Sequence, residues 1–245
     1  MMSGYCTVVT GAAGGIGRVV VSSLLAEGKR VVAVDAAADR LEELFGGNPD
    51  AVCVGCDLSL ETAVDAVAAA VASCSEGVEG FVHAAGGDSM APLGMVESET
   101  MHGLFAVHAV FPALFLGWLA KKRNHAPGAS AVLVSSVSAH EGAKGRVAYA
   151  AAKGAVEGML KPAAAELAAK GMRLNAVVLG IVETDMSRQW MAKLPEERIA
   201  ALRMEYPLGF GSPENAAGAI CFLLSRQAAW IAGQTIVCDG GHSLA

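Results

Sequence analysis

The chain alternates short apolar runs with longer alanine-rich stretches, and this alternation restricts the fold more than any other feature of the sequence. The short runs, which we predict to be strands, are Tyr5–Thr10, Arg30–Asp35, Ala51–Cys56, Gly80–His83, Ala131–Ser135, Arg173–Val178 and Gln234–Cys238. The longer stretches, which we predict to be helices, lie near Gly15–Glu27, Leu60–Cys74, Glu99–Lys122, Ala148–Lys170 and Pro213–Ser225. Alternating strands and helices form βαβ units with right-handed crossovers. The sequence therefore predicts an α/β fold, a doubly wound parallel sheet of about seven strands with helices on both faces.

No linker divides the chain, because no Pro/Ser-rich stretch, charge block or internal repeat interrupts the alternation. We therefore expect a single domain over residues 1–245. Only the stretch 184–211 departs from the pattern, with apolar residues such as Met186 and Trp190 around a polar centre. We expect it to be a helical flap that covers the substrate at the carboxyl ends of the strands, where open α/β sheets bind ligands.

Charge and cysteine content argue against two kinds of binding. The chain has 18 Lys and Arg against 24 Asp and Glu, a net charge of −6, whereas nucleic-acid binding needs clustered basic residues. The six cysteines lie mostly in apolar runs, which is typical of buried free thiols. Cys53 and Cys56 form a CxxC pair, but neither a second pair nor a histidine cluster completes a zinc site. We expect no metal and no nucleic-acid partner.

The sequence also favours a cytoplasmic protein without a membrane partner. The N-terminal residues lack the charged region and the long apolar stretch of a signal peptide. The longest apolar run, Leu104–Ala120, contains His108 and Pro112 and is shorter than the ~20 residues that a spanning helix needs. We expect this run to be a buried or subunit-interface helix.

A glycine-rich turn follows the first predicted strand and leads directly into the first predicted helix. Its residues with a predicted cofactor-binding role are Gly11, Ala13, Gly15, Ile16 and Gly17. Glycines permit a tight turn and close approach of the backbone to a pyrophosphate, which the first N–H groups of the helix can then bind. The alternative is a glycine-rich turn without a ligand. The position on the first βα turn favours a dinucleotide site.

Asp35 ends the second predicted strand, about 20 residues further along, where a carboxylate can bind the hydroxyl groups of an adenosine ribose. The same carboxylate would repel a 2′-phosphate, and neither Ala12-Ala13 nor Ala36-Ala37 supplies a basic residue. The sequence therefore favours NAD over NADP. The alternative is that Asp35 is only a turn residue at a strand end.

Tyr149 and Lys153 are four residues apart, which puts a phenol and an ammonium group on the same face of a helix. The ammonium group would favour the phenolate and lower the pKa of Tyr149 towards neutrality. Such a tyrosine can act as a general acid or base in an alcohol–ketone conversion. Upstream, Ser135 and Ser136 end a strand with hydroxyl groups that can hold a substrate oxygen.

These motifs, taken in order, resemble those of the single-domain branch of the short-chain dehydrogenase/reductase family, and the resemblance covers nearly the whole chain. The matching segments are Thr10–Gly17 (TGxxxGxG), Asp57-Leu58, His83–Gly86 (in place of NNAG), Ser136, Tyr149–Lys153 (YxxxK), Asn175–Thr184 (NxVxPGxxxT) and Gly233–Gly241. The resemblance implies a Rossmann-like fold. The Tyr-x3-Lys spacing differs from the Tyr-x6-Lys of the enoyl-reductase branch.

The resemblance also implies roles for individual residues. Tyr149 would give or take the proton, Ser136 would hydrogen-bond the carbonyl oxygen, and Lys153 would bind the nicotinamide ribose and lower the pKa of the tyrosine. Further cofactor contacts are implied for Asp57, Leu58, Ala84, Ala85, Gly86, Gly180, Val182 and Thr184. The implied activity is an NAD(P)-dependent oxidoreductase that interconverts a secondary alcohol and a ketone by hydride transfer, in a homodimer or homotetramer.

The sequence departs from the family pattern at three places. His108 stands where the family has the Asn of its proton relay; a neutral imidazole can donate and accept hydrogen bonds, so His108 is either a relay residue or a helix-packing residue. His83 and Ala84 replace two Asn residues, and we interpret His83 as structural. Leu179 replaces a Pro, which removes a fixed φ from the segment that would hold the nicotinamide.

Two other functions remain open from the sequence. The first is reduction of a 3-oxoacyl thioester, chemistry that normally uses NADPH and is therefore opposed by Asp35. The second is a non-catalytic NAD-binding protein on the same fold, which the complete set of Ser136, Tyr149 and Lys153 argues against. The sequence does not identify the substrate.

Overall fold

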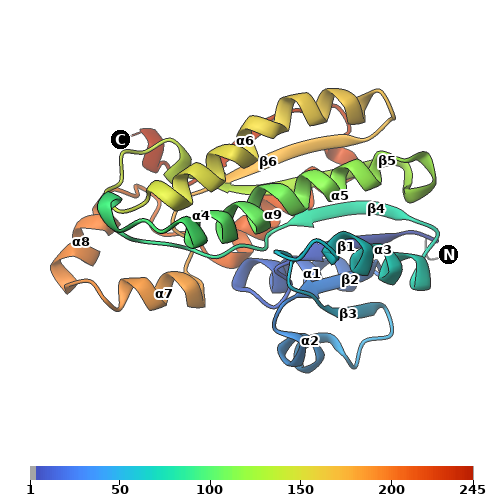
Figure 1. The fold of residues 1–245 in the computed structure, drawn as a ribbon, viewed down its shortest axis with the longest axis horizontal. Helices are drawn as coiled ribbons and strands as arrows, with labels where there is room; N and C mark the ends of the chain where they lie inside the picture. Colours follow the sequence, from blue (N-terminus) through green and yellow to red (C-terminus); the bar gives the residue numbers. More distant parts are fainter. Residues whose placement is uncertain (1–3, 245) are drawn as a thin grey trace.

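The computed structural model describes residues 4–244 and contains the parallel sheet that the sequence predicts (Figure 1). Within these residues the sheet has seven strands in the order β3-β2-β1-β4-β5-β6-β7, and all adjacent pairs are parallel. The strands are β1 (Cys6–Thr10), β2 (Arg30–Asp35), β3 (Ala51–Gly55), β4 (Val78–His83), β5 (His125–Ser136), β6 (Arg173–Leu179) and β7 (Thr235–Cys238). The predicted fold class is confirmed.

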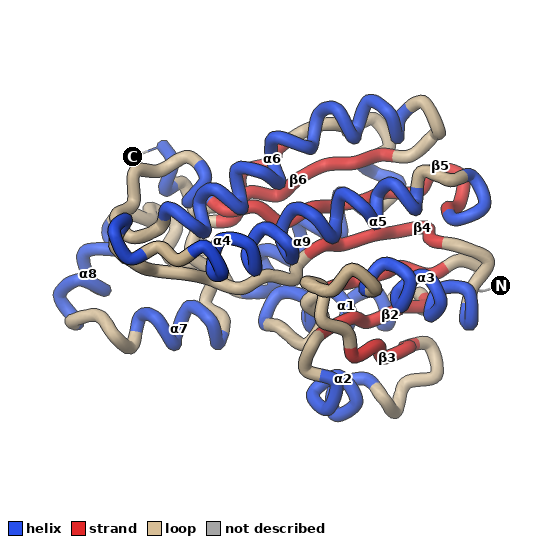
Figure 2. Tube along the Cα trace, in the orientation of Figure 1, coloured by secondary structure: helices blue, strands red, loops and turns tan. Residues whose placement is uncertain are grey.

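Helices cover both faces of this sheet (Figure 2). They are α1 (Gly15–Ala26), α2 (Ala38–Phe45), α3 (Ala63–Cys74), α4 (Ser98–Phe105), α5 (Phe111–Leu119), α6 (Val147–Ala168), α7 (Asp185–Met191), α8 (Glu196–Met204) and α9 (Pro213–Leu224). One core cluster joins one face of the sheet to α3, α5 and α6, and the other joins the opposite face to α1, α2 and α9. Strands buried on both faces must be apolar throughout, which is why they appear in the sequence as continuous apolar runs.

The order of the strands reverses direction at β1, because β2 lies on one side of it and β4 on the other. The connections that leave β1 and β4 therefore run to opposite faces of the sheet and open a crevice at the carboxyl ends of these strands. Gly11 lies at this point with φ of 69°, and a Cβ there would lie 2.6 Å from the backbone nitrogen of Ala85. Only glycine allows the two connections to pass so close together.

A continuous helical run extends from Ser98 to Leu119, so the expectation that the apolar run is too short to span a membrane was wrong as to length. By length and composition alone its 22 residues could cross a membrane, and 39% of its most apolar window is buried within the chain. A core helix of a globular protein meets the same criteria, and Phe115 and Leu119 are fully buried here. The run includes a π-helical segment, Ala106–Val110, and such segments occur frequently at functional sites.

Between β6 and α9 the chain leaves the sheet in an excursion that contains α7 and α8 (Figure 1). An isolated parallel bridge between Val182 and Gly211 closes its base, supported by a 2.9 Å hydrogen bond from the Gly211 N–H to the Ile181 carbonyl. The predicted stretch 184–211 thus coincides with this excursion. Its role as a substrate cover stays a prediction.

Candidate active site

One cavity of about 1170 Å³ lies at the carboxyl ends of the strands, at the point where the strand order reverses. Its volume exceeds the ~300–1,000 Å³ of most small-molecule pockets. The residues with predicted site roles all line it: Gly11, Ala13, Gly15, Ile16, Gly17, Asp35, Asp57, Leu58, Ala84, Ala85, Gly86, His108, Ser136, Tyr149, Lys153, Gly180, Val182 and Thr184. The fold therefore brings the predicted residues together, whereas their individual roles stay predictions.

The glycine turn forms a cradle that side chains would fill. A Cβ on Gly15 would lie 2.6 Å from the Thr184 methyl carbon, and one on Gly17 would overlap the Gly11 carbonyl. Helix α1 begins after Gly14 without a side-chain cap and without an acidic residue in its first turn. Its first N–H groups are thus available to an anion, as the pyrophosphate of a dinucleotide requires.

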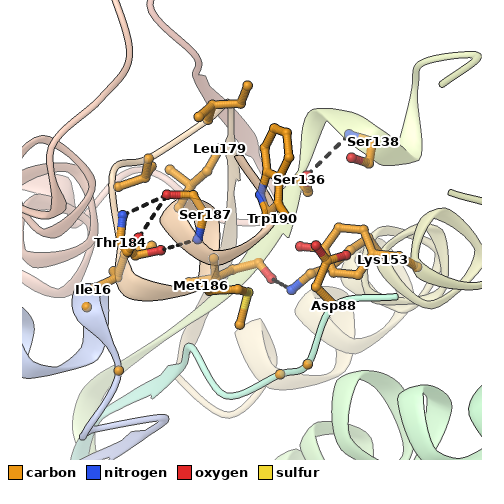
Figure 3. Close-up of a pocket in the computed structure, with 18 of the residues that line it drawn as sticks. Ile16, Asp88, Ser136, Ser138, Lys153, Leu179, Thr184, Met186, Ser187 and Trp190 are labelled. Atoms are coloured by element: carbon orange, nitrogen blue, oxygen red, sulfur yellow. Dashed lines mark hydrogen bonds between the residues drawn. The ribbon is translucent and has the colours of Figure 1, made fainter. Parts of the chain in front are cut away.

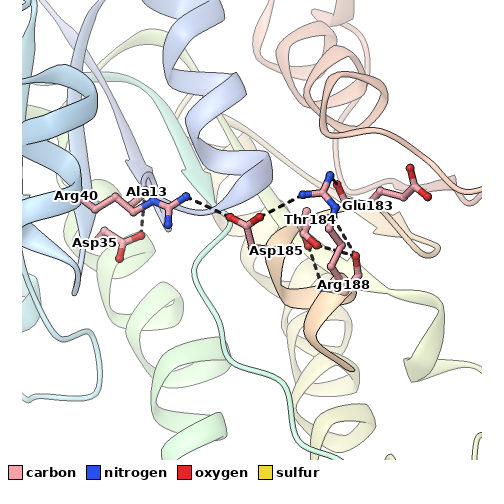
Figure 4. A network of polar contacts seen from close by, with 8 residues as sticks. Ala13, Asp35, Arg40, Glu183, Thr184, Asp185 and Arg188 are labelled. Atoms are coloured by element: carbon pink, nitrogen blue, oxygen red, sulfur yellow. Dashed lines mark hydrogen bonds and ion pairs between the residues drawn. The ribbon is translucent and has the colours of Figure 1, made fainter. Parts of the chain in front are cut away.

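Asp35 is held rigidly at the edge of this cradle (Figure 4). Its carboxylate accepts hydrogen bonds of 3.0 Å from the backbone N–H groups of Ala13 and Ala37. Sequence reasoning missed Arg40, which lines the same cavity and forms a 3.2 Å ion pair with Asp185 at the start of α7. Arg40, the first cationic residue after Asp35, is therefore already paired with a carboxylate.

Lys153 and Tyr149 lie on α6 and line the cavity, and Figure 3 shows Lys153 on the cavity wall. The Lys153 side chain is buried, its Nζ donates a 2.8 Å hydrogen bond to the Val134 carbonyl, and burial lowers its pKa to about 8. Burial raises the pKa of Tyr149 to about 12, and the negative charge of Asp88 adds to this rise, whereas a hydrogen bond with Ser136 and the charge of Arg146 oppose it.

Lys153 is not among the groups that shift the pKa of Tyr149 in the site as described, so its role in lowering that pKa stays a prediction. The Lys153 Nζ lies 5.7 Å from the centre of the tyrosine ring and is bonded to a carbonyl, so desolvation of the phenolate dominates. Tyr149 therefore holds its proton at neutral pH, which is the form that can protonate an oxygen.

His108 lies in the π-helical segment, and its ring stands at 84° to the ring of Tyr149, with centroids 5.8 Å apart. Its Nε2 must donate the 3.0 Å hydrogen bond to the Gly87 carbonyl, because that oxygen can only accept. Nδ1 is then an acceptor, and it is buried without a hydrogen-bond partner among residues 4–244. Burial, followed by the charge of Lys153, lowers the pKa of His108 to about 3, so the ring is neutral.

His83 connects the end of β4 to the same π-helical segment. The hydroxyl of Thr10 lies 2.8 Å from its Nδ1, and its Nε2 donates to the Val107 carbonyl at 3.0 Å. The fully buried side chain thus holds the neighbour of His108 against two central strands. These contacts agree with the structural interpretation of His83.

The segment after β6 is fixed without the proline that Leu179 replaces. Its backbone donates two hydrogen bonds, from Gly180 to the Cys238 carbonyl at 3.2 Å and from Ile181 to the Tyr206 hydroxyl at 3.1 Å. Thr184 then caps α7 reciprocally with Ser187, as Figure 3 shows. Tertiary contacts therefore replace the restriction of φ that a proline supplies.

Sequence reasoning also missed an ion pair at the opposite end of the cavity. Asp88, in the connection after β4, accepts a hydrogen bond from Arg146, the residue before α6. The Arg146 guanidinium carbon lies 5.5 Å from the centre of the Tyr149 ring and 5.6 Å from that of the Trp190 ring. No motif marks either residue, so only the fold reveals the pair.

Comparison with known proteins agrees with the motifs. A family model described as "Enoyl-(Acyl carrier protein) reductase" matches residues 11–243. The chain is 32% identical to D-threitol dehydrogenase of Mycolicibacterium smegmatis, over 99% of this chain and 94% of that protein. It is also 32% identical to 3-oxoacyl-[acyl-carrier-protein] reductase FabG of Thermotoga maritima, over 98% of both chains. Among solved structures, a short-chain glucose/ribitol dehydrogenase from Brucella melitensis is 27% identical and covers 100% of this chain and 98% of its own, with a TM-score of 0.91.

Proposed function

Because the chain belongs to the short-chain dehydrogenase/reductase family, we propose that it is an NAD(H)-dependent oxidoreductase that interconverts a secondary alcohol and a ketone. One observation carries the proposal above the others. Ser136, Tyr149 and the buried Lys153 line the cavity that also contains the glycine cradle, and Ser136 lies close enough to lower the pKa of Tyr149 against the effect of burial. A proton donor for an oxygen and a cradle for a dinucleotide therefore share one enclosed space.

The chain's own groups handle the proton in this proposal. Tyr149, protonated at neutral pH, donates its proton to the ketone oxygen, and Ser136 hydrogen-bonds the same oxygen. Lys153 supplies hydrogen-bond donors to the cofactor ribose. When bound, a nicotinamide cofactor supplies the hydride, while the protein contributes orientation and electrostatics. In the direction of alcohol oxidation, the deprotonated Tyr149 would receive the proton, so oxidation should be favoured at high pH.

Two features support NAD rather than NADP. The Asp35 carboxylate, fixed by two backbone N–H groups, suits ribose hydroxyl groups and repels a 2′-phosphate. Arg40, which lines the same cavity, is engaged by Asp185 in a surface ion pair. Asp57 and Leu58 would lie beside the adenine ring.

His108 fits a relay position. Its unprotonated Nδ1 is a buried acceptor in the cavity wall, and we infer that it holds a water that carries protons between Lys153 and solvent. Because its pKa is about 3, protonation of this ring should produce no loss of kcat between pH 5 and 8. The His108→Asn variant should accordingly show the same profile over that range.

The excursion at residues 184–211 is proposed as the substrate cover. Met186 and Trp190 of α7 line the cavity, as do Leu194 and Leu202 further along. Their apolar side chains suit the part of a substrate that carries no reacting group.

A 3-oxoacyl-thioester reductase is the second candidate, favoured by the FabG relative. Turnover of a panel of ketones, alcohols and 3-oxoacyl thioesters with NADH and with NADPH separates the two functions. Preference for a thioester with NADPH would support the second candidate. Turnover of simple ketones with NADH supports the first.

Tyr149→Phe tests the chemistry directly. Loss of the proton donor should lower kcat by about 10²–10⁴-fold, while the Kd of NADH, measured by fluorescence titration, should change little. Tyr5→Phe is the matched control, because it removes the hydroxyl of a tyrosine that precedes the first residue of β1 and does not line the cavity. Turnover by Tyr149→Phe close to that of the wild type would overturn the assignment.

A further inference from the structure

Asp88 and Arg146 form an ion pair with little solvent exposure beside the reacting groups. Only 14% of the Arg146 side chain and 18% of the Asp88 side chain are exposed, and both residues line the cavity. Removing two charges from water carries a desolvation penalty that their mutual attraction does not always recover. Stability of the fold alone therefore does not explain an ion pair at this position.

Joining the two connections is not a sufficient reason. The Ala91 N–H already donates a 2.9 Å hydrogen bond to the Gly145 carbonyl, which fastens the connection after β4 to the one before α6. Gly145 adopts φ of 80°, and a Cβ there would lie 3.3 Å from the Met90 side chain. The backbone thus sets the position of Arg146, and the ion pair adds charge to a contact that already exists.

The pair also reaches the groups that would handle the proton. The Arg146 guanidinium lies over the Tyr149 ring, and the charge of Asp88 raises the pKa of both Tyr149 and Lys153. Figure 3 shows Asp88 and Lys153 on the wall of the same cavity, with Trp190 on the side of α7. A substrate bound against Tyr149 therefore shares the cavity with a carboxylate and a guanidinium.

We propose that Asp88 and Arg146 recognise a hydroxyl group on the carbon next to the reacting one, so that the substrates are vicinal diols and the corresponding α-hydroxyketones. This inference rests on the proposed function of the same site. A hydroxyl donates to the carboxylate and accepts from the guanidinium, so one small group satisfies both members of the pair.

Other neighbouring groups fit less well. An alkyl group would remove water from both charged side chains and return no hydrogen bond. A carboxylate would be attracted by Arg146 and repelled by Asp88, which together carry no net charge. Only a group that both donates and accepts complements the pair.

The experiment compares ketones that differ by one hydroxyl, acetoin against 2-butanone and 2-hydroxycyclohexanone against cyclohexanone, with NADH as the reductant. The wild type should prefer the hydroxylated member in kcat/KM by about 10- to 100-fold, the range for one hydrogen bond to a charged group. In the double variant Asp88→Leu with Arg146→Met, this ratio should fall towards one. Asp88→Asn, which keeps the size of the side chain, should also lower it and serves if the double variant folds poorly.

The matched control removes another ion pair, Lys29 with Glu79, in the part of the sheet away from the cavity. Lys29→Met with Glu79→Gln should leave the ratio unchanged. A wild-type ratio near one, a ratio that survives in the double variant, or a preference for 2-oxobutanoate over acetoin overturns this inference alone if ketones are reduced. No turnover of any of these ketones with either cofactor overturns the proposed function and, with it, this inference.

Discussion

Replacing Gly86 by alanine should destabilise the protein through a single clash. A Cβ at this position would overlap Cε1 of His108 and lie 2.7 Å from both ring nitrogens. The ring is fully buried and bonded to the Gly87 carbonyl, so it cannot move aside without losing that hydrogen bond. Overpacking costs about 1–3 kcal/mol, and the lost bond adds about 0.5–1.5 kcal/mol. We expect the free energy of unfolding to fall by about 2–4 kcal/mol.

Thermal unfolding measures this effect against a control in the same connection. For a chain of this size, 1 kcal/mol lowers Tm by about 2–4 °C, so Gly86→Ala should unfold roughly 5–15 °C below the wild type. A Cβ on Gly87 would find only the Leu104 side chain, at 3.9 Å, so Gly87→Ala should unfold near the wild-type temperature.

A double variant tests the cause. Combining Gly86→Ala with His108→Ala removes the ring that the new methyl group meets. The loss of stability in the double variant should therefore be smaller than the sum of the losses in the two single variants, by at least about 1 kcal/mol. Equal stability of Gly86→Ala and Gly87→Ala, or full additivity in the double variant, would refute the packing argument.

Three further outcomes are expected. Asp35→Ala with Ala36→Arg should move the ratio of NADPH to NADH affinities, measured by titration, towards NADPH, because a repelling carboxylate is exchanged for a cation. Burial lowers the pKa of Lys153 to about 8 from its ordinary 10.5, so between these values the unfolded chain holds a proton that the folded chain lacks, and wild-type stability rises with pH across that window. In urea unfolding, Lys153→Met should therefore be more stable than the wild type at pH 7, by a margin that shrinks towards pH 10.5. The predicted homodimer or homotetramer is tested by Gly158→Trp on α6: no atom lies within 4 Å of a Cβ there, so the chain itself can accept the ring, and a lower mass in light scattering is expected if this surface contacts a second copy.

The predictable parts of the fold are those in which one physical constraint determines the residue type. Strands buried on both faces need continuous apolar runs, and the turn after β1 needs glycine where the backbone passes Ala85. Helix α2 was missed because it has only eight residues and buries only Leu41 and Phe45, too few to give a clear period. The long helix before β5 was predicted near Glu99–Lys122 and runs from Ser98 to Leu119, although its first turns are not strongly apolar.

The candidate site was predictable as a set of residues but not as an electrostatic environment. The spacing of Tyr149 and Lys153 places both on one helix face, yet it does not reveal that burial raises the pKa of the tyrosine. Asp88 and Arg146 are 58 residues apart and meet only because two connections converge at one end of the sheet. Desolvation and long-range pairing are properties of the folded chain, so no local pattern contains them.

The bridge between Val182 and Gly211 makes the excursion between them an exchangeable cassette. Its two ends already meet at the rim of the sheet, and doubling the length of a closed loop costs only about 0.6 kcal/mol of extra closure entropy. Insertions, deletions or grafts at these two positions can therefore replace one wall of the cavity while Tyr149 and Lys153 on α6 keep their places. The reacting groups and this wall of the cavity thus lie in separable stretches of the gene, so that selection can alter the wall without rebuilding the reacting groups.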